Sequence, residues 1–312
     1  MAPLALRPLS IVGPTASGKS ALAMSLARRC GAELVSVDSM QVYRGMDIGT
    51  AKPSKADQQL VKHHMIDMLD PNEECSVAWF REQADDVVAE LTRREVPVIL
   101  VGGTGLYLRA LVDRLELPGQ YPTIAAELDG EPDTHRLFER LRSMDPRAAS
   151  RMEPTNRRRV LRALEVTIGS GRPFSDFGPG LETYPEVETV IVGLEVDRAE
   201  LDGRLESRFD QQLAAGFLDE VRRIEAATGW SRTSAQALGY RELLDHVRGD
   251  RPLEECRRDA LAHTRRFAVR QQRWFRRDPR IAWFDFSRPD LVDAVEERWR
   301  KESESGATAS LP

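Results

Sequence analysis

The chain has 312 residues, of which 41% are hydrophobic and 30% are charged, and its formal net charge is −5. This composition is typical of a globular protein with a sizeable core, and it argues against an evenly basic nucleic-acid binder. The sequence has no apolar run of the ~18–20 residues that a membrane helix needs, and its first residues lead into a strand rather than a signal, so we expect a cytoplasmic protein.

Short apolar segments alternate with helical patterns over the first 111 residues. The pattern predicts strands at 9–12, 33–37, 65–69 and 96–101. It predicts helices after the glycine-containing segment at 13–20, after Ser76 as an N-cap, and from about residue 105. Such alternation with short connections is typical of a parallel sheet covered on both faces.

The pattern changes near residue 112, where prolines begin to separate helical segments and no strand is evident. A strand is expected again at 189–196, followed by a long helix through Leu201 and Val221. We therefore predict an α/β protein, a P-loop nucleotide-binding-type parallel sheet flanked by helices, with a helical insertion domain. The predicted core is 1–111 with 187–300, the insertion is 112–186, and 301–312 is expected to be a disordered tail.

The segment "GPTASGKS" has the spacing G-x-x-x-x-G-K-[ST] and lies between a predicted strand and a predicted helix. Backbone N–H groups in such a loop surround phosphate oxygens, Lys19 adds a positive charge, and the Ser20 hydroxyl can bind Mg²⁺. The sequence thus predicts a diphosphate or polyphosphate site with Ser20 as a metal ligand. Its residues are Gly13, Pro14, Thr15, Ala16, Ser17, Gly18, Lys19 and Ser20.

A carboxylate is expected near these phosphates, but not where an ATPase usually has one. The predicted strand at 96–101 is followed by "GGTG" without an acidic residue, which weakens a hydrolase interpretation. Asp38 instead follows the second predicted strand, and the carboxyl ends of parallel strands face the ligand crevice. We expect Asp38 to orient a metal ion or to accept a proton, with Lys52 and Thr50 as further donors nearby.

Arginines are concentrated in two stretches of this acidic chain. Residues 257–280 carry a local charge of +7, and residues 151–162 carry +4. Clusters of this kind mark either solvated helix faces or a surface that binds nucleic acid, and charge alone leaves both interpretations open.

Cysteine and histidine residues predict no metal site. Cys30, Cys75 and Cys256 are far apart in the sequence, so we expect reduced, structural thiols. His63 and His64 are adjacent but no second pair completes a set of ligands, so we expect structural roles.

Several motifs, in this order along the chain, carry a resemblance to a known family. They are "GPTASGKS", "DSMQVYRGMDIGTAKP", "HHMIDMLDP", "GGTGLYLRAL", "RRVLRALEV", "SRFDQQLAAGFLDEV", "ALGYRE" and "TRRFAVRQQRWFRRD". With them the chain resembles the tRNA dimethylallyltransferases, also called the IPP transferase family. The first motif alone is generic, whereas its combination with the second and fourth is highly specific.

The resemblance implies a reaction. A dimethylallyl group would move from dimethylallyl diphosphate to N6 of adenosine 37, next to the anticodon of tRNAs that read codons beginning with U. The products would be N6-isopentenyladenosine and diphosphate. It implies Mg²⁺ as cofactor, the glycine loop as the diphosphate site, and Asp38, Thr104 and Arg208 as catalytic residues. Arg208 has an alternative interpretation as a surface partner of Glu206 or Asp210.

The resemblance also implies a tRNA anticodon stem-loop as partner. We separately expect a monomer that does not associate with a membrane. The residues expected at the RNA are Asp38, Ser39, Met40, Gln41, Arg158, Arg159, Val160, Leu161, Arg162, Gly239, Tyr240, Arg241, Arg265, Arg266 and Arg270. A helix cap explains Gly239 and its neighbours nearly as well.

Other functions fit parts of the sequence. A kinase of a small metabolite would use the glycine loop for ATP, but would leave the arginine-rich stretches without a role. A prenyltransferase acting on free adenine nucleotides would not need them in two regions. In an RNA-binding or regulatory protein without catalysis, Asp38 would be dispensable.

Overall fold

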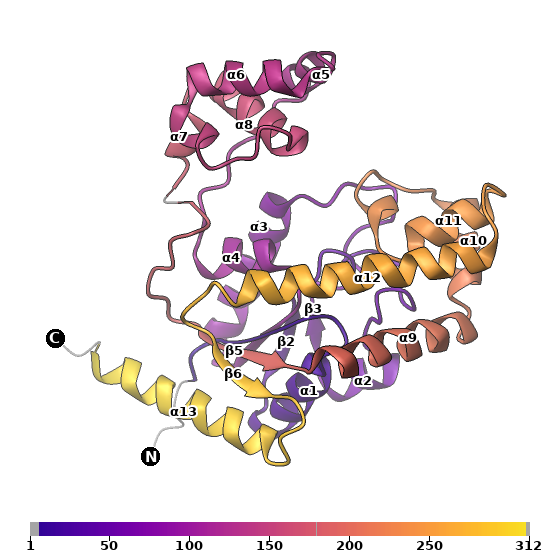
Figure 1. The fold of residues 1–312 in the computed structure, drawn as a ribbon. Helices are drawn as coiled ribbons and strands as arrows, with labels where there is room; N and C mark the ends of the chain where they lie inside the picture. Colours follow the sequence, from indigo (N-terminus) through magenta and orange to yellow (C-terminus); the bar gives the residue numbers. More distant parts are fainter. Residues whose placement is uncertain (1–5, 179, 310–312) are drawn as a thin grey trace. The chain divides into compact units, whose positions relative to one another are not determined.

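The computed structural model describes residues 6–178 and 180–309, and the chain divides into two compact units (Figure 1). The core unit combines the chain up to Val112 with the chain from Glu186 onward, and the insertion unit is Asp113–Pro185. Each unit has an apolar core of its own.

The core unit is built on a parallel sheet of six strands. Every pairing between neighbouring strands is parallel, which confirms the predicted α/β class. The strand β1, which leads into the glycine loop, lies between β4 and β5 in the sheet. The strands are β1 (Leu9–Val12), β2 (Glu33–Ser36), β3 (His63–His64), β4 (Val98–Val101), β5 (Val190–Glu195) and β6 (Ala282–Asp285), in the order β3-β2-β4-β1-β5-β6.

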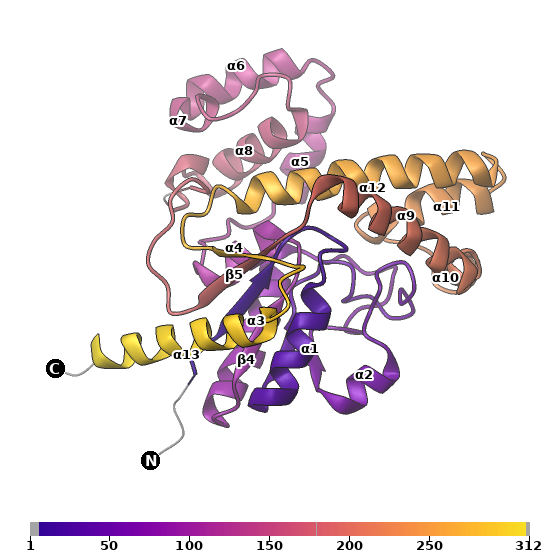
Figure 2. The same cartoon turned by 60° about the horizontal axis from the view of Figure 1, so that its bottom comes forward.

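Helices cover both faces of the sheet, because alternate strand residues point to opposite sides. On β4, Ile99 belongs to the apolar cluster that contains Leu26 of α1 (Lys19–Cys30) and Trp299 of α13 (Leu291–Ala309). Its neighbour Leu100 belongs to the other cluster, with Phe80 of α3 (Val77–Arg93). Figure 2 shows α1 and α13 near each other on the side of the sheet that the first cluster fills.

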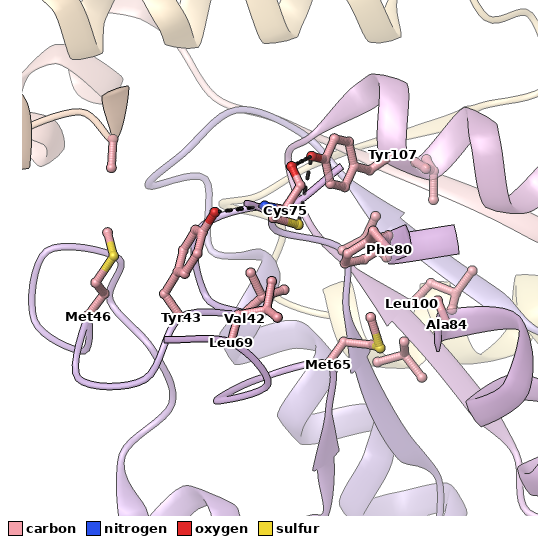
Figure 3. Packing of buried hydrophobic residues seen from close by; sticks show 14 of the residues in the cluster. Val42, Tyr43, Met46, Met65, Leu69, Cys75, Phe80, Ala84, Leu100 and Tyr107 are labelled. Carbon is pink, nitrogen blue, oxygen red and sulfur yellow. Dashed lines mark hydrogen bonds between the residues drawn. The ribbon is translucent and has the colours of Figure 1, made fainter. Parts of the chain in front are cut away.

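The second cluster also fixes the loop that follows β2 (Figure 3). The Tyr43 hydroxyl accepts a hydrogen bond from the backbone N–H of Cys75 at 3.2 Å. The Tyr107 hydroxyl of α4 (Gly105–Val112) donates to the Cys75 carbonyl at 3.5 Å. Burial raises the pKa of the Cys75 thiol to about 11, so this cysteine stays protonated and has a packing role.

The remaining helices of the core unit follow β5 in the sequence, except for α2, which lies between β2 and β3. The helices α9 and α12 run side by side and α11 packs on α12, as both views show. These elements are α2 (Lys55–Leu60), α9 (Arg198–Ala214), α10 (Phe217–Ala227), η2 (Ser234–Gln236), α11 (Tyr240–Val247) and α12 (Leu253–Phe275).

The insertion unit is helical over the described residues 113–178 and 180–185, without a strand. Its core includes Leu137 and Leu141 from α6 and Val160 and Leu164 from α8. Its elements are α5 (Pro122–Asp129), α6 (Thr134–Met144), α7 (Pro146–Ala149), α8 (Arg157–Ser170) and η1 (Phe174–Asp176).

The structure corrects three predictions of secondary structure and adds one strand. The strand expected at 65–69 lies at 63–64, since Met65 and Asp67 have positive φ angles of 63° and 55° that end the extended backbone. The long helix expected through Leu201 and Val221 is broken by Gly216 at φ 99°. The strand β6 was not predicted.

The tail expected from 301 to be disordered is helical through Ala309 as part of α13. The last residues of the predicted tail, 310–312, lie outside the described residues.

Candidate functional site at the carboxyl ends of the strands

The P-loop, residues 13–20, connects β1 to α1 through backbone conformations that favour glycine. Gly13 and Gly18 have φ angles of 143° and 92°, and Ala16 has φ 63°. A side chain on Gly13 would lie 2.9 Å from the Leu194 carbonyl oxygen. The helix α1 begins at Lys19, and Gly18 as its N-cap provides no side-chain acceptor. The first N–H groups of α1 are therefore available for an anion.

The Lys19 side chain reaches back to the P-loop. Its Nζ donates to the Pro14 carbonyl at 2.5 Å. Burial, together with repulsion from Arg208, lowers the pKa of Lys19 to about 7, although Asp38 acts in the opposite direction. A bound diphosphate would reverse this shift, because a nearby negative charge favours the protonated amine.

Asp38 lies just after β2, and its charge interacts with those of Lys19 and Arg208. Its carboxylate accepts the backbone N–H of Met40 at 2.9 Å, which turns the chain after the strand. Burial raises the pKa of Asp38, and the Met40 N–H, Lys19 and Arg208 reduce that rise. Asp38 is thus a carboxyl with a raised pKa near two cationic side chains, a combination typical of a proton acceptor in a site.

Thr104 and Arg208 connect the P-loop to the loops beside it. The Thr104 hydroxyl accepts the backbone N–H of Ser39 at 3.4 Å, next to Asp38. Arg208 on α9 donates to the Thr15 hydroxyl at 3.5 Å. Burial lowers the pKa of Arg208, whereas the charge of Asp38 raises it.

The surface role considered for Arg208 does not match these contacts. Among the described residues Arg208 forms no ion pair, whereas Glu206 and Asp210 both pair with Arg257 of α12. Arg208 is therefore directed toward the P-loop residue Thr15.

The acceptor loop, residues 38–52, is held by contacts within it and with neighbouring segments, and Lys52, Thr50 and Gln41 all have partners inside the protein. The Lys52 side chain is 2% exposed and its Nζ lies 2.6 Å from both the Asp47 and Asp67 carboxylates, so it is not a free phosphate donor. The Thr50 hydroxyl donates to the Met46 carbonyl.

The Gln41 amide is likewise occupied within the protein. It accepts from the Ser36 hydroxyl at 2.8 Å and donates to the Thr50 carbonyl at 3.2 Å. Its side chain therefore shapes the acceptor loop rather than being free to pair with a base. Ser39 and Met40, in contrast, are partly exposed.

A buried carboxylate that sequence reasoning missed fixes the middle of the acceptor loop. Glu220 of α10 is 1% exposed, and it accepts the backbone N–H groups of Asp47, Ile48 and Gly49 at 2.9–3.2 Å. It also accepts the Tyr240 hydroxyl at 2.5 Å. Tyr240 is 1% exposed, so its side chain supports this loop from inside the protein.

The other predicted RNA residues near Tyr240 have structural neighbours. Gly239 donates its N–H to Glu242 at 2.9 Å, which caps α11. Arg241 is partly exposed, and its guanidinium pairs with the same Glu242 carboxylate at 2.7 Å. The alternative that this segment is a helix cap is thus realised in the structure.

The arginines of α12 fall on two faces of the helix. Arg265 contacts Glu206 and Asp202 of α9, and Arg257 contacts Asp210, so both charges are compensated. The free arginine face, made of Arg266, Arg270 and Arg273, is exposed and pairs with no carboxylate among the described residues. Their spacing of four and three residues places them on one side of the helix.

The arginines of α8 differ in the same way. Arg158 and Arg159 are exposed, and within the described chain neither pairs with a carboxylate. Arg162 pairs with Glu165 at 2.7 Å and donates to the Pro118 carbonyl. Val160 is fully buried in the core of the insertion unit and Leu161 is partly buried. The Val160 side chain therefore presents no surface in the structure.

The described residues form neither a cluster of metal-binding side chains nor a membrane-spanning helix. No group of three or more His, Cys, Asp or Glu side chains there is arranged to hold a metal ion. His64 instead lies 2.6 Å from the Glu33 carboxylate, in agreement with a structural role. Residues 6–178 and 180–309 also contain no helix that is both apolar enough and long enough to cross a membrane.

Comparison with known proteins identifies one family. The family described as IPP transferase matches residues 41–278. Two relatives are tRNA dimethylallyltransferases, one from Acidothermus cellulolyticus with 47% identity over 93% of this chain and 92% of that protein. The other, from a Nocardioides species, is 44% identical over 91% and 93% of the two chains. A crystal structure of the full-length tRNA isopentenylpyrophosphate transferase from Bacillus halodurans matches with a TM-score of 0.71 and 34% identity, covering 96% of this chain and 99% of that one.

Proposed function

The chain belongs to the IPP transferase family and is a tRNA dimethylallyltransferase that modifies adenosine 37, and we propose that its donor is dimethylallyl diphosphate bound at the P-loop. The observation that carries this assignment is the grouping of Lys19, Arg208 and Asp38 around the P-loop, where Asp38 affects the pKa of both cations and both cations affect the pKa of Asp38. Two cations suit a diphosphate, and the carboxylate suits the attacking amine.

The proposed reaction breaks one bond and forms one. The allylic C–O bond of the donor breaks and its electron pair remains on the diphosphate, while N6 of adenine forms a bond to the allylic carbon. Lys19 and Arg208 stabilise the negative charge that develops on the leaving group. Asp38 accepts the proton that N6 loses, and Thr104, whose hydroxyl is bonded to Ser39 N–H beside Asp38, lies close to the reacting centre.

The residues present fit Mg²⁺ as the cofactor. Ser20 is exposed at the start of α1, and its hydroxyl is a hard oxygen ligand. Mg²⁺ in nucleotide and diphosphate sites keeps several water molecules and binds substrate oxygens, so a complete protein cage is not required. We propose that Ser20 holds Mg²⁺ together with the donor diphosphate, where the ion neutralises charge on the leaving group.

The acceptor is proposed to be the anticodon stem-loop of tRNAs that read codons beginning with U. An adenine in an RNA loop reaches a recessed site only when its nucleotide is turned out of the stack. Ser39 and Met40, partly exposed next to Asp38, are the proposed contacts of this base. Arg158 and Arg159 of α8 and the free arginine face of α12 are proposed to bind RNA phosphates.

The cellular setting follows from the substrates. We propose that the enzyme acts in the cytoplasm, where tRNA and a water-soluble diphosphate donor are both available. A single chain is the proposed acting unit, since Lys19, Asp38, Thr104 and Arg208 all come from one chain.

The activity assay distinguishes this function from its alternatives. With Mg²⁺, labelled dimethylallyl diphosphate and unmodified tRNA, we expect label on adenosine 37 of the RNA. Digestion to nucleosides followed by mass spectrometry locates the added group. Label on free AMP would instead support a prenyltransferase of nucleotides, and phosphate transfer from ATP to a metabolite would support a kinase. No label on any acceptor would support a non-catalytic RNA-binding protein.

Charge removal on α12 tests the RNA surface. We expect Arg266→Gln with Arg270→Gln to raise the Kd for tRNA roughly 10- to 100-fold, because each lost arginine removes one charged contact to phosphate. The slope of log Kd against log salt should become shallower by about 1 per arginine. Donor affinity should stay unchanged.

The matched control is Arg251→Gln with Arg257→Gln, which removes the same charge from arginines that already pair with Asp259 and Asp210. We expect the control to leave the salt slope as it is. Equal changes of slope in both double variants would show that only net charge matters, and would refute a phosphate contact on the free arginine face.

A further inference from the structure

We propose that Gln271 of α12 is a positioning residue for the transfer reaction, because its side-chain amide ties the P-loop to the loop that carries Thr104. The backbone N–H of Thr15 donates to Gln271 Oε1 at 2.9 Å. Gln271 Nε2 donates to the Gly103 carbonyl at 2.8 Å. The Gln271 side-chain amide therefore bridges the loop after β1 and the loop after β4.

Each end of this bridge lies next to a residue of the proposed chemistry. The Thr15 hydroxyl accepts a hydrogen bond from the Arg208 guanidinium at 3.5 Å. Gly103 precedes Thr104, whose hydroxyl accepts the Ser39 N–H next to Asp38. A shift of the Gln271 amide would therefore move the leaving-group side and the proton-acceptor side of the site relative to each other.

The Gln271 side chain is buried, and its amide has a hydrogen-bond partner at each end. Its residue is 6% exposed, and a side chain added to Gly103 would lie 2.2 Å from Gln271 Nε2. A side chain at residue 103 would displace the Gln271 amide, whose donor and acceptor are both used by the two loops. An apolar replacement would leave a buried N–H and a buried C=O without partners, which disfavours the present loop geometry.

Gln271 is not part of the surface proposed for RNA. It lies on the buried side of α12 with Ala268 and Phe275, whereas Arg266 and Arg270 lie on the exposed side. The inference rests on the proposed function for the identity of the reaction. It does not rest on it for the effect on the P-loop, which diphosphate binding measures by itself.

The test compares Gln271→Met with Gln272→Met in the full chain. The second substitution is chemically identical, is made one residue along the same helix, and changes a partly exposed side chain. For Gln271→Met we expect kcat to fall roughly 30- to 100-fold, as for other small misplacements of reacting groups. The KM for tRNA should stay within about twofold, since the arginines on the opposite side of α12 are unchanged.

Titration with inorganic diphosphate in a calorimeter supplies a readout independent of catalysis. We expect about 3- to 10-fold weaker binding for Gln271→Met and parent-like binding for Gln272→Met. Gln271→Glu keeps an acceptor for Thr15 N–H but places an oxygen against the Gly103 carbonyl. Its negative charge beside the P-loop should also weaken diphosphate binding, so both variants should lose kcat and diphosphate affinity. A parent-like circular dichroism spectrum and melting temperature separate this result from a general loss of folding.

Two results would overturn the proposal. One is a kcat for Gln271→Met within threefold of the parent, and the other is an equal loss in Gln272→Met. Failure of the parent protein to prenylate tRNA would instead count against the proposed function, and the diphosphate titrations would still decide the role of Gln271.

Discussion

Asp38→Asn should reduce the turnover of tRNA prenylation by about 10²–10⁴ while donor binding is retained. An amide cannot accept the proton that adenine N6 loses, so the chemical step is slowed. Donor affinity should be equal or tighter, because the carboxylate near Lys19 and Arg208 repels an incoming diphosphate. Single-turnover kinetics with saturating tRNA measures the first effect, and calorimetric titration with inorganic diphosphate measures the second.

The pH dependence of turnover provides a second readout for Asp38. Burial raises its pKa, so the parent rate should fall with decreasing pH at a value above the usual range of an aspartate. The control is Asp70→Asn, which removes an exposed carboxylate that pairs with Arg44. Turnover of Asp38→Asn equal to that of the control would rule out a general-base role.

Lys19→Met should lower kcat/KM for the donor by about 10²–10³, the loss typical of removing one group that stabilises developing negative charge. The pKa of Lys19 near 7 in the free protein adds a signature that depends on pH. A bound diphosphate raises this pKa, so at pH 8 the amine gains a proton when the donor binds. Donor affinity should therefore fall as the pH rises above 7, until the pKa of the bound state is reached.

Calorimetry in buffers with different ionisation enthalpies measures this proton uptake. At pH 8 the parent should take up a substantial fraction of a proton, and Lys19→Met should take up less by that amount. Below pH 6 the two proteins should agree, since Lys19 is then protonated in both states. Identical uptake by parent and variant at pH 8 would show that Lys19 does not titrate on binding.

Local sequence signals predicted the P-loop and the position of Asp38. The P-loop motif is recognised from eight consecutive residues between β1 and α1. Asp38 was placed near the phosphates because the carboxyl ends of parallel strands face the ligand crevice. The insertion was visible because its prolines and helical patterns interrupt the alternation of strands and helices. The strand β6 was not predicted because none of its residues is fully buried, unlike those of the equally short β1.

The partners of polar side chains could not be predicted, because they come from distant parts of the chain. Lys52 was expected near phosphates, but the positive φ of Asp67 turns the chain so that its carboxylate meets the Lys52 ammonium. Arg265 lies within a run of arginines, but only the packing of α9 on α12 shows that Glu206 compensates it. Gln271 was hidden in the same run, where its spacing from Ala268 and Phe275 was the one available signal.

The carboxylate of Glu220 has a consequence for the thermodynamics of base capture. It immobilises three successive amides of the acceptor loop through contacts within the protein itself. Fixing a residue's backbone costs about 1–2 kcal/mol in lost conformational freedom. Here that loss occurs once, when the polypeptide first folds, and is not repeated at each encounter with an anticodon.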